Sequence, residues 1–114
     1  MSVSPRLSIV TINRNNAAGL HKTIASLRSQ TCMDFQWVFV DGASTDESLA
    51  IAKTFLRDGD VCISEADRGI YHAMNKAIPL TLGVYVMYLN SGDILKQVDG
   101  VDIILQTLNA NQDP

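Results

Sequence analysis

Residues 35–43, Phe35-Gln36-Trp37-Val38-Phe39-Val40-Asp41-Gly42-Ala43, are the stretch that decides the fold. Aromatic and β-branched residues fill the first six positions apart from Gln36, a composition typical of a β-strand. The run ends abruptly at Asp41-Gly42-Ala43, and a helical pattern follows to about residue 57. We expect that helix to begin with a capping box at Ser44-Thr45-Asp46-Glu47. A strand, a turn and a helix in this order form the repeating unit of an α/β fold.

The same alternation continues on both sides of this segment. Apolar runs predict further strands at 7–12, 61–64 and 84–89, and helical spacing predicts helices at 17–29, 69–78 and 99–109. Strands and helices that alternate with short loops indicate a mainly parallel sheet with helices on it. The unbroken apolar character of 84–89 predicts a central strand, buried on both faces.

Size and composition limit the classes of protein to consider. At 114 residues the chain is expected to form a single domain, 1–114, and its apolar fraction of 46% is ordinary for a folded soluble protein. No segment approaches the roughly 20 uninterrupted apolar residues of a membrane helix. The net charge of −3 argues against nucleic acid as a partner, because phosphate-backbone binders usually carry a basic stripe.

Cysteine usage and the first residues indicate the compartment. Cys32 and Cys62 lack the spacing of metal ligands, so we expect two buried thiols in a reducing environment. Residues 1–6 lack the charged and apolar regions of a secretory signal. The sequence therefore predicts a cytoplasmic protein.

Asp41 is the first candidate for ligand binding. Ligands of open α/β sheets lie at the carboxyl ends of the strands, and Asp41 directly follows one. A carboxylate there accepts hydrogen bonds from a ribose hydroxyl or a base N–H. The alternative is a carboxylate that only stabilises a helix N-terminus, a role that Asp46 fills better. We therefore favour a ligand contact for Asp41.

Arg68 is a candidate for binding phosphate. Arg68-Gly69 precedes a predicted helix, and a cation beside a helix N-terminus favours a diphosphate. The alternative is a surface ion pair with Glu65 or Asp67, which is common and contributes little stability.

Asn90-Ser91-Gly92-Asp93 is a candidate metal-binding turn. Mg²⁺ or Mn²⁺ usually takes one or two carboxylates from the protein and completes its shell with phosphate oxygens and water, so Asp93 alone would suffice. The alternative is an ordinary turn, which the segment by itself favours.

Four motifs in one order carry a family resemblance. They are Thr11-Ile12-Asn13-Arg14-Asn15-Asn16, Val40-Asp41-Gly42-Ala43-Ser44-Thr45-Asp46, Ser64-Glu65-Ala66-Asp67-Arg68-Gly69-Ile70-Tyr71-His72-Ala73-Met74-Asn75 and Leu89-Asn90-Ser91-Gly92-Asp93. Together they closely resemble the family 2 glycosyltransferases, and the nearest branch looks like bacterial enzymes of exopolysaccharide and colanic-acid-type synthesis. The resemblance extends from about residue 7 to residue 95.

The resemblance implies a Rossmann-like fold of the GT-A type that binds a nucleotide-diphospho-sugar, with UDP as the leading nucleotide. It implies inverting transfer of the sugar to an acceptor hydroxyl, saccharide or lipid-linked, with Mn²⁺ or Mg²⁺ on the diphosphate. Asp93 matches the metal-binding position. The nucleotide-binding set is Thr11, Asn13, Arg14, Asp41, Arg68 and Ser91. Within it Thr11 and Asn13 match the segment that lies against the base. Arg14 stands where many relatives have an aromatic residue, so stacking on the base is either lost or replaced by stacking of the guanidinium.

The chain departs from the family in its acidic motifs and in its length. Many relatives have consecutive acids in both turns, whereas this chain has Asp41-Gly42 and Gly92-Asp93. No residue matches the general base, which relatives carry in a second half. We therefore expect the N-terminal, donor-binding part of a longer enzyme, inactive alone, prone to self-association, and membrane-associated at the inner face when full length.

Two other classes of function share features with this chain. A nucleotide-binding module without catalytic activity is the alternative to a glycosyltransferase domain. A signalling receiver domain has a similar size and a parallel sheet, but it needs an acidic pair after its first strand. That loop reads Asn13-Arg14-Asn15-Asn16 here, which excludes the receiver interpretation.

Overall fold

The computed structural model describes residues 5–110, so the segment before Pro5, for which no secretory signal is predicted, lies outside the described residues. Its elements, in chain order, are β1 (Leu7–Asn13), α1 (Ala17–Arg28), β2 (Gln36–Asp41), α2 (Ser48–Lys53), β3 (Val61–Ser64), α3 (Ile70–Ala77), the short 3₁₀ turn η1 (Ile78–Leu80), β4 (Tyr85–Tyr88) and α4 (Gly100–Ala110). The strands form one sheet in the order β3-β2-β1-β4, and every neighbouring pair is parallel. The predicted parallel α/β architecture is confirmed.

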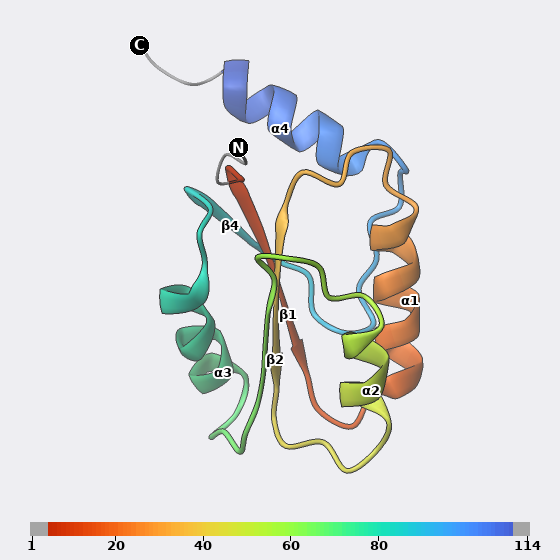
Figure 1. Cartoon of the computed structure of the whole chain (residues 1–114), viewed down its shortest axis with the longest axis vertical. Coiled ribbons are helices and arrows are strands. Elements are labelled where there is room, and N and C mark those ends of the chain that lie inside the picture. Colours follow the sequence, from red (N-terminus) through yellow and green to blue (C-terminus); the bar gives the residue numbers. More distant parts are fainter. Residues whose placement is uncertain (1–4, 111–114) are drawn as a thin grey trace.

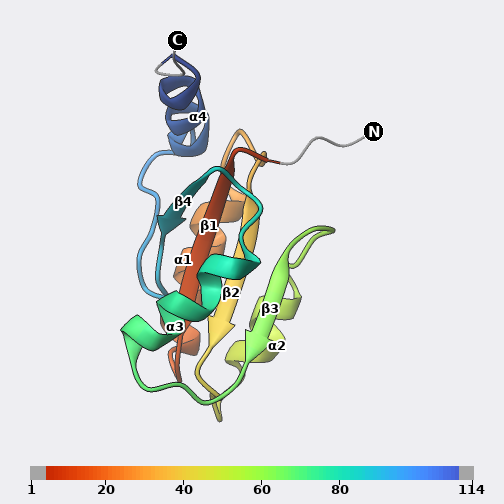
Figure 2. The same cartoon turned by 90° about the vertical axis from the view of Figure 1, so that its left-hand side faces the viewer.

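Helices cover both faces of the sheet, with α1 and α2 on one side and α3 on the other (Figure 1). Side chains of β1 and β2 alternate between two apolar clusters. Trp37 and Phe39 belong to the larger cluster, under α1 and α2, and Val38 and Val40 pack against α3. Both strands therefore have apolar side chains on both faces, which is why their sequences are nearly continuous runs of apolar residues. Figure 2, turned by 90°, shows α3 in front of the sheet and α1 behind it.

The position of β4 differs from the prediction. It lies at the edge of the described sheet, beside β1 alone, and its residues are half-buried or exposed. The buried central strands are β1 and β2. An apolar run records that both faces of a strand touch apolar groups, as Met87 and Val86 do on opposite faces of β4. It does not record how many strands lie beside it, and within residues 5–110 β4 is an edge strand rather than the predicted central one.

The start and the end of α2 also differ from the prediction. The N-cap position is Glu47, which makes no side-chain cap hydrogen bond. The Ser44 hydroxyl donates instead to Asp41 Oδ1 at 2.6 Å, and a buried carboxylate is the stronger acceptor. The capping box is therefore absent. The helix ends at Lys53 rather than near residue 57.

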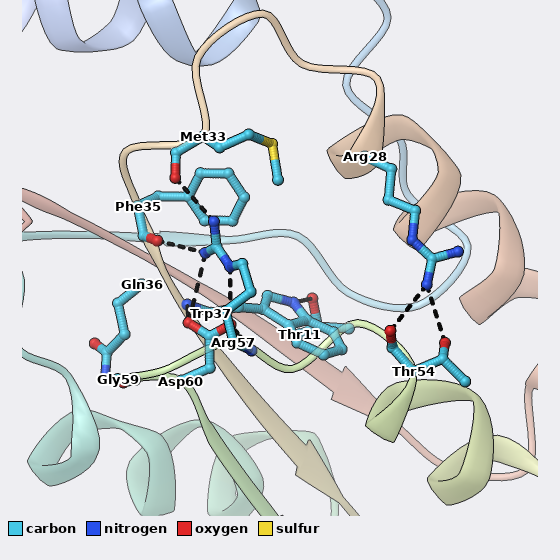
Figure 3. A network of polar contacts seen from close by, with 10 residues as sticks. All are labelled: Thr11, Arg28, Met33, Phe35, Gln36, Trp37, Thr54, Arg57, Gly59 and Asp60. Atoms are coloured by element: carbon cyan, nitrogen blue, oxygen red, sulfur yellow. Dashed lines mark hydrogen bonds and ion pairs between the residues drawn. The ribbon is translucent and has the colours of Figure 1, made fainter.

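Arg57 holds the segment that follows α2 in place. Its guanidinium donates to the carbonyls of Met33 and Phe35 at 2.9 and 2.6 Å and pairs with Asp60 at 3.1 Å (Figure 3). It also lies 4.5 Å from the centre of the Phe35 ring. Asp60 in turn accepts the Trp37 backbone N–H at 2.8 Å. This network ties the segment before β3 to the amino end of β2.

The remaining fold predictions concern the cysteines and membrane helices. Cys32 and Cys62 are free thiols and are half-buried rather than buried, and burial raises the pKa of the Cys62 thiol. Within residues 5–110, no helix has the length and apolar character needed to cross a membrane.

Candidate functional site

The carboxyl ends of the four parallel strands meet at one edge of the sheet. β2 and β3 add on one side of β1, and β4 adds on the other, so the strand order reverses between β1 and β4. Open α/β sheets bind their ligands at such a reversal, outside the carboxyl ends of the strands. The predicted site residues all lie at the strand ends or on the loops that follow them, apart from Thr11, which lies within β1.

Asp41, at the end of β2, is the centre of a buried hydrogen-bond cluster. Its side chain is 0% exposed. Oδ1 accepts from Asn13 Nδ2 at 2.9 Å and from the Ser44 hydroxyl at 2.6 Å. Oδ2 accepts from the Ser44 backbone N–H and from the Ser64 hydroxyl, both at 2.8 Å. The carboxylate therefore joins the ends of β1, β2 and β3.

These four hydrogen bonds set the charge state of Asp41. Burial alone would raise the pKa of the carboxyl, but the bonds from Ser44, Asn13 and Ser64 outweigh it and hold the pKa below its ordinary value. Both oxygens are engaged by the chain itself. The direct nucleoside contact stays a prediction, and in this conformation a ligand would have to replace one of the four bonds.

Asn13, at the end of β1, borders a hollow between β1 and α3. Its side chain is 2% exposed, and its Oδ1 has no hydrogen-bond partner within residues 5–110. The hollow measures about 210 Å³. Its walls combine the apolar side chains Ile12, Ile70 and Ala73 with Gly69, Asn13, Arg14 and Asp67. Asn13 and Arg14, predicted together from the first motif, thus lie in one hollow.

The loops after β1 and β2 are locked to one another by Asn15. Its backbone has a positive φ of 47°, and its Oδ1 accepts the backbone N–H groups of Thr45 and Asp46 at 2.7 and 3.3 Å. Asp46 joins the same two loops from the other side, because its Oδ2 accepts the backbone N–H of Ala17, the first residue of α1, at 3.1 Å. Sequence analysis did not single out Asn15 for this role. Its occurrence in an Asn-rich loop was the available signal.

The turn that carries Asp93 is held from α1. The Asp93 N–H donates to the Asn90 carbonyl at 2.8 Å, and Gly92 has a φ of 99°, as the third position of a type II turn requires. The buried Thr23 hydroxyl donates to the Asp93 carbonyl at 2.7 Å and accepts the Gly92 N–H at 2.9 Å. The segment is therefore an ordinary turn whose backbone is fixed from α1.

Asn16 and Thr23 are the supporting residues of this turn that sequence analysis missed. Asn16 caps α1, accepting the Gly19 N–H at 3.2 Å, and its Nδ2 donates to the carbonyl and hydroxyl oxygens of Ser91 at 3.2 and 3.3 Å. An Asn before a helical pattern was a readable cap signal. Thr23 is a polar residue beside the apolar stripe of α1, which gave a weaker signal.

Asp93 presents an exposed carboxylate at this turn. Oδ2 accepts the Asn90 N–H at 3.2 Å, and within residues 5–110 Oδ1 has no hydrogen-bond partner. The described residues contain no group of three or more His, Cys, Asp or Glu side chains placed to hold a metal. A cation here would take one carboxylate from the chain and the rest of its shell from ligand and water oxygens, which suits Mg²⁺ or Mn²⁺. The donor set fits such an ion.

The loop that carries Arg68 is fixed by α3. His72 Nδ1 accepts the Arg68 backbone N–H at 2.8 Å, and Asp67 Oδ1 accepts the Gly69 N–H at 3.1 Å. Glu65 pairs with Lys76 at 3.2 Å rather than with Arg68. Arg68 precedes α3, as predicted, and its side chain is exposed. Within residues 5–110 it forms neither of the alternative ion pairs, with Glu65 or with Asp67.

Thr11 lies beneath the site. It is buried, donates to the Leu89 carbonyl at 2.7 Å and accepts the Trp37 indole N–H at 2.9 Å. Its side chain therefore anchors the strand that leads into the Asp93 turn. Its predicted contact with a base stays a prediction.

Comparison with known proteins places these features in a family. Residues 8–98 match the model of the family described as glycosyl transferase family 2. A "PGL/p-HBAD biosynthesis glycosyltransferase" of Mycobacterium bovis is 38% identical over 99 residues, which cover 84% of this chain and 39% of that protein. An uncharacterized glycosyltransferase of Mycobacterium tuberculosis is 31% identical over 96% of this chain and 41% of its own length. The chain thus spans about two fifths of these relatives.

A solved structure has the same fold. The mannosyltransferase of Pyrobaculum calidifontis, in complex with GDP-Man and Mn²⁺, superposes with a TM-score of 0.80 at 22% identity. The match covers 99% of this chain and 34% of that one. The predicted GT-A type of fold is therefore confirmed.

Proposed function

The chain belongs to glycosyl transferase family 2, and on this premise we propose that it is the donor-binding domain of a glycosyltransferase that binds a nucleotide-diphospho-sugar. The observation that carries the proposal is the exposed Asp93 carboxylate on a turn fixed by Thr23, at the reversal of the strand order. Such a turn holds a rigid anionic group beside the place where this class of sheet binds ligands.

Each predicted residue has a place in the proposal. Asp93 would hold Mn²⁺ or Mg²⁺, which when bound neutralises charge on the diphosphate leaving group. Ser91 and Arg68 are proposed at the diphosphate, and Arg14 at the base. Thr11, Asn13 and Asp41 belong to the same nucleotide-binding set, and their burial supports a role that includes holding the loops in place.

The finer predictions also remain proposals. They are UDP as the nucleotide, inverting transfer to a saccharide or lipid-linked hydroxyl, exopolysaccharide or colanic-acid-type synthesis, a cytoplasmic location at the inner face of the membrane, and a homo-oligomer. The named relatives are mycobacterial glycosyltransferases, and the solved mannosyltransferase holds GDP-Man with Mn²⁺. Those names support a sugar nucleotide with Mn²⁺ as the first cation to test.

The catalytic base is proposed to lie outside this chain. An incoming hydroxyl needs a base on the face opposite the leaving group, and Asp93 would stand with the cation on the leaving-group side. The relatives are more than twice as long as the matched region. The second candidate function, nucleotide binding without transfer, would apply if no part of the protein supplies that base.

Thermal unfolding with nucleotides tests the proposal. UDP, GDP, dTDP and CDP are each added with and without Mn²⁺ to the wild type, to Asp93→Asn and to the control Asp58→Asn. Asp58 is an exposed carboxylate beyond the amino end of the sheet, so its variant makes the same change of charge away from the site. A ligand at about 100 times its dissociation constant stabilises the fold by roughly 2.7 kcal/mol.

We expect a shift that needs Mn²⁺, is retained by Asp58→Asn and is lost by Asp93→Asn. A shift that is equal in all three proteins would remove Asp93 from the metal site. Absence of any shift would contradict the donor-binding function. Sugar transfer by the 114-residue chain itself would contradict a base outside it.

A further inference from the structure

Residues 89–99, which we call the strap, connect β4 to α4 and lie along α1 (Figure 1). All of them are described by the structure, and they form neither a helix nor a strand. Their backbone groups therefore need partners from another element. The strap carries Asp93 near its beginning, so the contacts that hold the strap also bear on the place of that carboxylate.

A row of polar side chains on α1 faces the strap. Thr23, Ser26 and Gln30 are three and four residues apart, a spacing that puts side chains on one face of a helix, and Gln30 directly follows the C-cap. Thr23 bonds to the turn at Gly92 and Asp93. The other two residues bond to the strap further along the chain, so the row follows the strap from its turn to its end.

Ser26 holds the strap two residues after Asp93. Its hydroxyl oxygen accepts the Leu95 backbone N–H at 3.2 Å, and the hydroxyl donates to the Thr23 carbonyl at 2.8 Å. The strap is thus anchored at Asp93 by one side chain and at Leu95 by the next. A group that binds a metal has to be held within about 0.5 Å of its productive place by supporting contacts. A second anchor fixes the direction in which the chain leaves the turn, which the first anchor alone does not.

Gln30 holds the far end of the strap, and its side chain is 6% exposed. Its Nε2 donates to the carbonyls of Gln97 and Ser26 at 2.9 and 3.2 Å, and its Oε1 accepts the Val101 N–H at 2.9 Å. That N–H belongs to the first turn of α4, where a helix has no carbonyl of its own to accept it. Rotating the amide by half a turn would set two donors against each other, so the contacts allow one orientation. Gln30 thus caps α4 from outside that helix.

We propose that Ser26 and Gln30 are positioning residues for the cation site, which hold the strap on α1 and thereby fix where the Asp93 carboxylate meets the cation. This rests on the proposed donor-binding function. Both residues act through the backbone of the strap. The bond from Leu95 lies two residues from Asp93 and the bond to Gln97 lies four, so Ser26 has the larger effect on the site.

Ser26→Ala tests the near anchor. Thermal unfolding is followed with saturating GDP or UDP while Mn²⁺ is titrated, and the Mn²⁺ concentration that gives half of the nucleotide-dependent shift is measured. We expect that concentration to rise about tenfold, the lower end of the loss that is typical when a residue supporting a metal ligand is removed. A merely structural role would lower the unfolding temperature without ligand and leave the required Mn²⁺ concentration unchanged.

Ser29→Ala is the matched control. Ser29 lies at the end of the same helix, and its exposed hydroxyl donates to the Ala25 carbonyl of that helix at 2.9 Å. Alanine therefore removes the same group from α1 without a change in the contacts to the strap. The Mn²⁺ requirement should stay as it is in the wild type.

Gln30→Met tests the far anchor. Methionine keeps an unbranched side chain of similar length and removes the partner of the Val101 N–H and of the Gln97 carbonyl. We expect faster hydrogen exchange at Val101 and a rise in the Mn²⁺ requirement that is smaller than in Ser26→Ala. If this variant does not fold, Ser26→Ala decides the question alone.

Gln106→Met is the matched control for the glutamine. Gln106 is an exposed residue of α4 whose amide donates to the Asp102 carboxylate at 3.1 Å. The variant makes the same change of side chain away from the strap. Exchange at Val101 and the Mn²⁺ requirement should both be as in the wild type.

Hydrogen exchange at Leu95 needs no ligand and separates this proposal from the function on which it rests. It should be faster in Ser26→Ala and unchanged in Ser29→Ala. If exchange at Leu95 or the Mn²⁺ requirement is the same in Ser26→Ala as in the wild type, the proposal fails and the donor site stands. If the wild type shows no nucleotide shift that depends on Mn²⁺, the proposed function fails and this proposal fails with it.

Discussion

Thr23 and Asp93 are 70 residues apart and are joined by a hydrogen bond of 2.7 Å from the Thr23 hydroxyl to the Asp93 carbonyl. The same hydroxyl oxygen accepts the Gly92 N–H at 2.9 Å. Thr23 is fully buried on α1, whereas the Asp93 side chain is exposed. Helix α1 therefore fixes the backbone of the turn, and the turn presents the carboxylate.

Thr23→Val should weaken both the fold and the cation site. Valine keeps the shape but removes the hydrogen bonds to the Gly92 N–H and to the Asp93 carbonyl, and two hydrogen bonds together contribute about 1–3 kcal/mol. We expect the free energy of unfolding to fall by that amount in urea titrations. The Mn²⁺-dependent part of any nucleotide shift should fall further, because Asp93 loses its fixed position.

Thr23→Ser is the control for that change. Serine retains the hydroxyl and loses one methyl group, so most of the Mn²⁺-dependent shift should return. Equal loss in the Ser and Val variants would mean that packing at this position, rather than the hydrogen bonds to the turn, supports the site.

Asp41 should make stability depend on pH. Its pKa in the folded protein lies below the ordinary value of 3.8, so the folded state favours the ionised form. The stabilisation is complete above about pH 5 and is lost as the pH falls through 3.8 toward the folded pKa. In Asp41→Asn the free energy of unfolding should be about 1–3 kcal/mol lower at pH 7, and its decrease toward pH 3 should be smaller.

Urea titrations from pH 3 to pH 7 measure both quantities. Asp58→Asn serves as the control, since it makes the same change of charge at an exposed position. An equally steep pH dependence in wild type and Asp41→Asn would show that other carboxylates carry the effect. Asp46 is one such group, because the hydrogen bonds from Ser48 lower its pKa too.

Lys76 should control the mobility of the loop that carries Arg68. Its ammonium group donates to the Ala66 carbonyl at 2.8 Å and pairs with Glu65 at 3.2 Å. The ion pair contributes little, because the Glu65 carboxylate is exposed, but the bond to the carbonyl holds the chain between β3 and α3. In Lys76→Met we expect faster hydrogen exchange at Arg68 and Gly69, with the sheet unaffected.

The exposed Lys22 on α1 offers a charge-matched control for that measurement. Lys22→Met should leave the exchange of the loop as it is in the wild type. Unchanged exchange in Lys76→Met would mean that the bonds from Arg68 to His72 and from Gly69 to Asp67 hold the loop without the lysine.

The sequence predicted best those features of the fold that depend on residues close together in the chain. Alternation of apolar runs and helical spacing predicted the parallel α/β sheet, and Asp41 and Asp93 were correctly expected at strand ends. Strand 7–12 and helix 17–29 lie within one residue of β1 and α1. These features depend on local periodicity and on the direction of the chain.

Features that depend on contacts between distant segments were not predictable. Ser44 has the same local sequence whether it caps a helix or donates to Asp41, and only the folded arrangement brings the carboxylate within 2.6 Å. Thr23 similarly gains its role from a turn 69 residues away. The position of β4 depends on which strand pairs with it, which its own residues do not encode.

The open edge of β4 should drive self-association of this chain. The Tyr85 N–H donates to the carbonyl of Arg6, just before β1, at 2.9 Å, and the Leu89 N–H donates to the carbonyl of Val10, in β1, at 2.8 Å. The alternate residues Val86 and Tyr88 therefore turn their backbone groups toward the outer edge. Within residues 5–110 no strand lies beyond it, and the strand Tyr85–Tyr88 contains no charge or proline. Unprotected edges of this kind tend to pair with another chain.

Val84, just before the strand, is 77% exposed. Sedimentation should therefore show oligomers that increase with concentration for the wild type and decrease for Val84→Lys, because a lysine at the edge opposes pairing. Ile103→Lys, on α4, adds the same charge at another exposed apolar position and should leave the association as it is in the wild type. A wild-type monomer at high concentration would show that the half-exposed strand does not recruit a second copy.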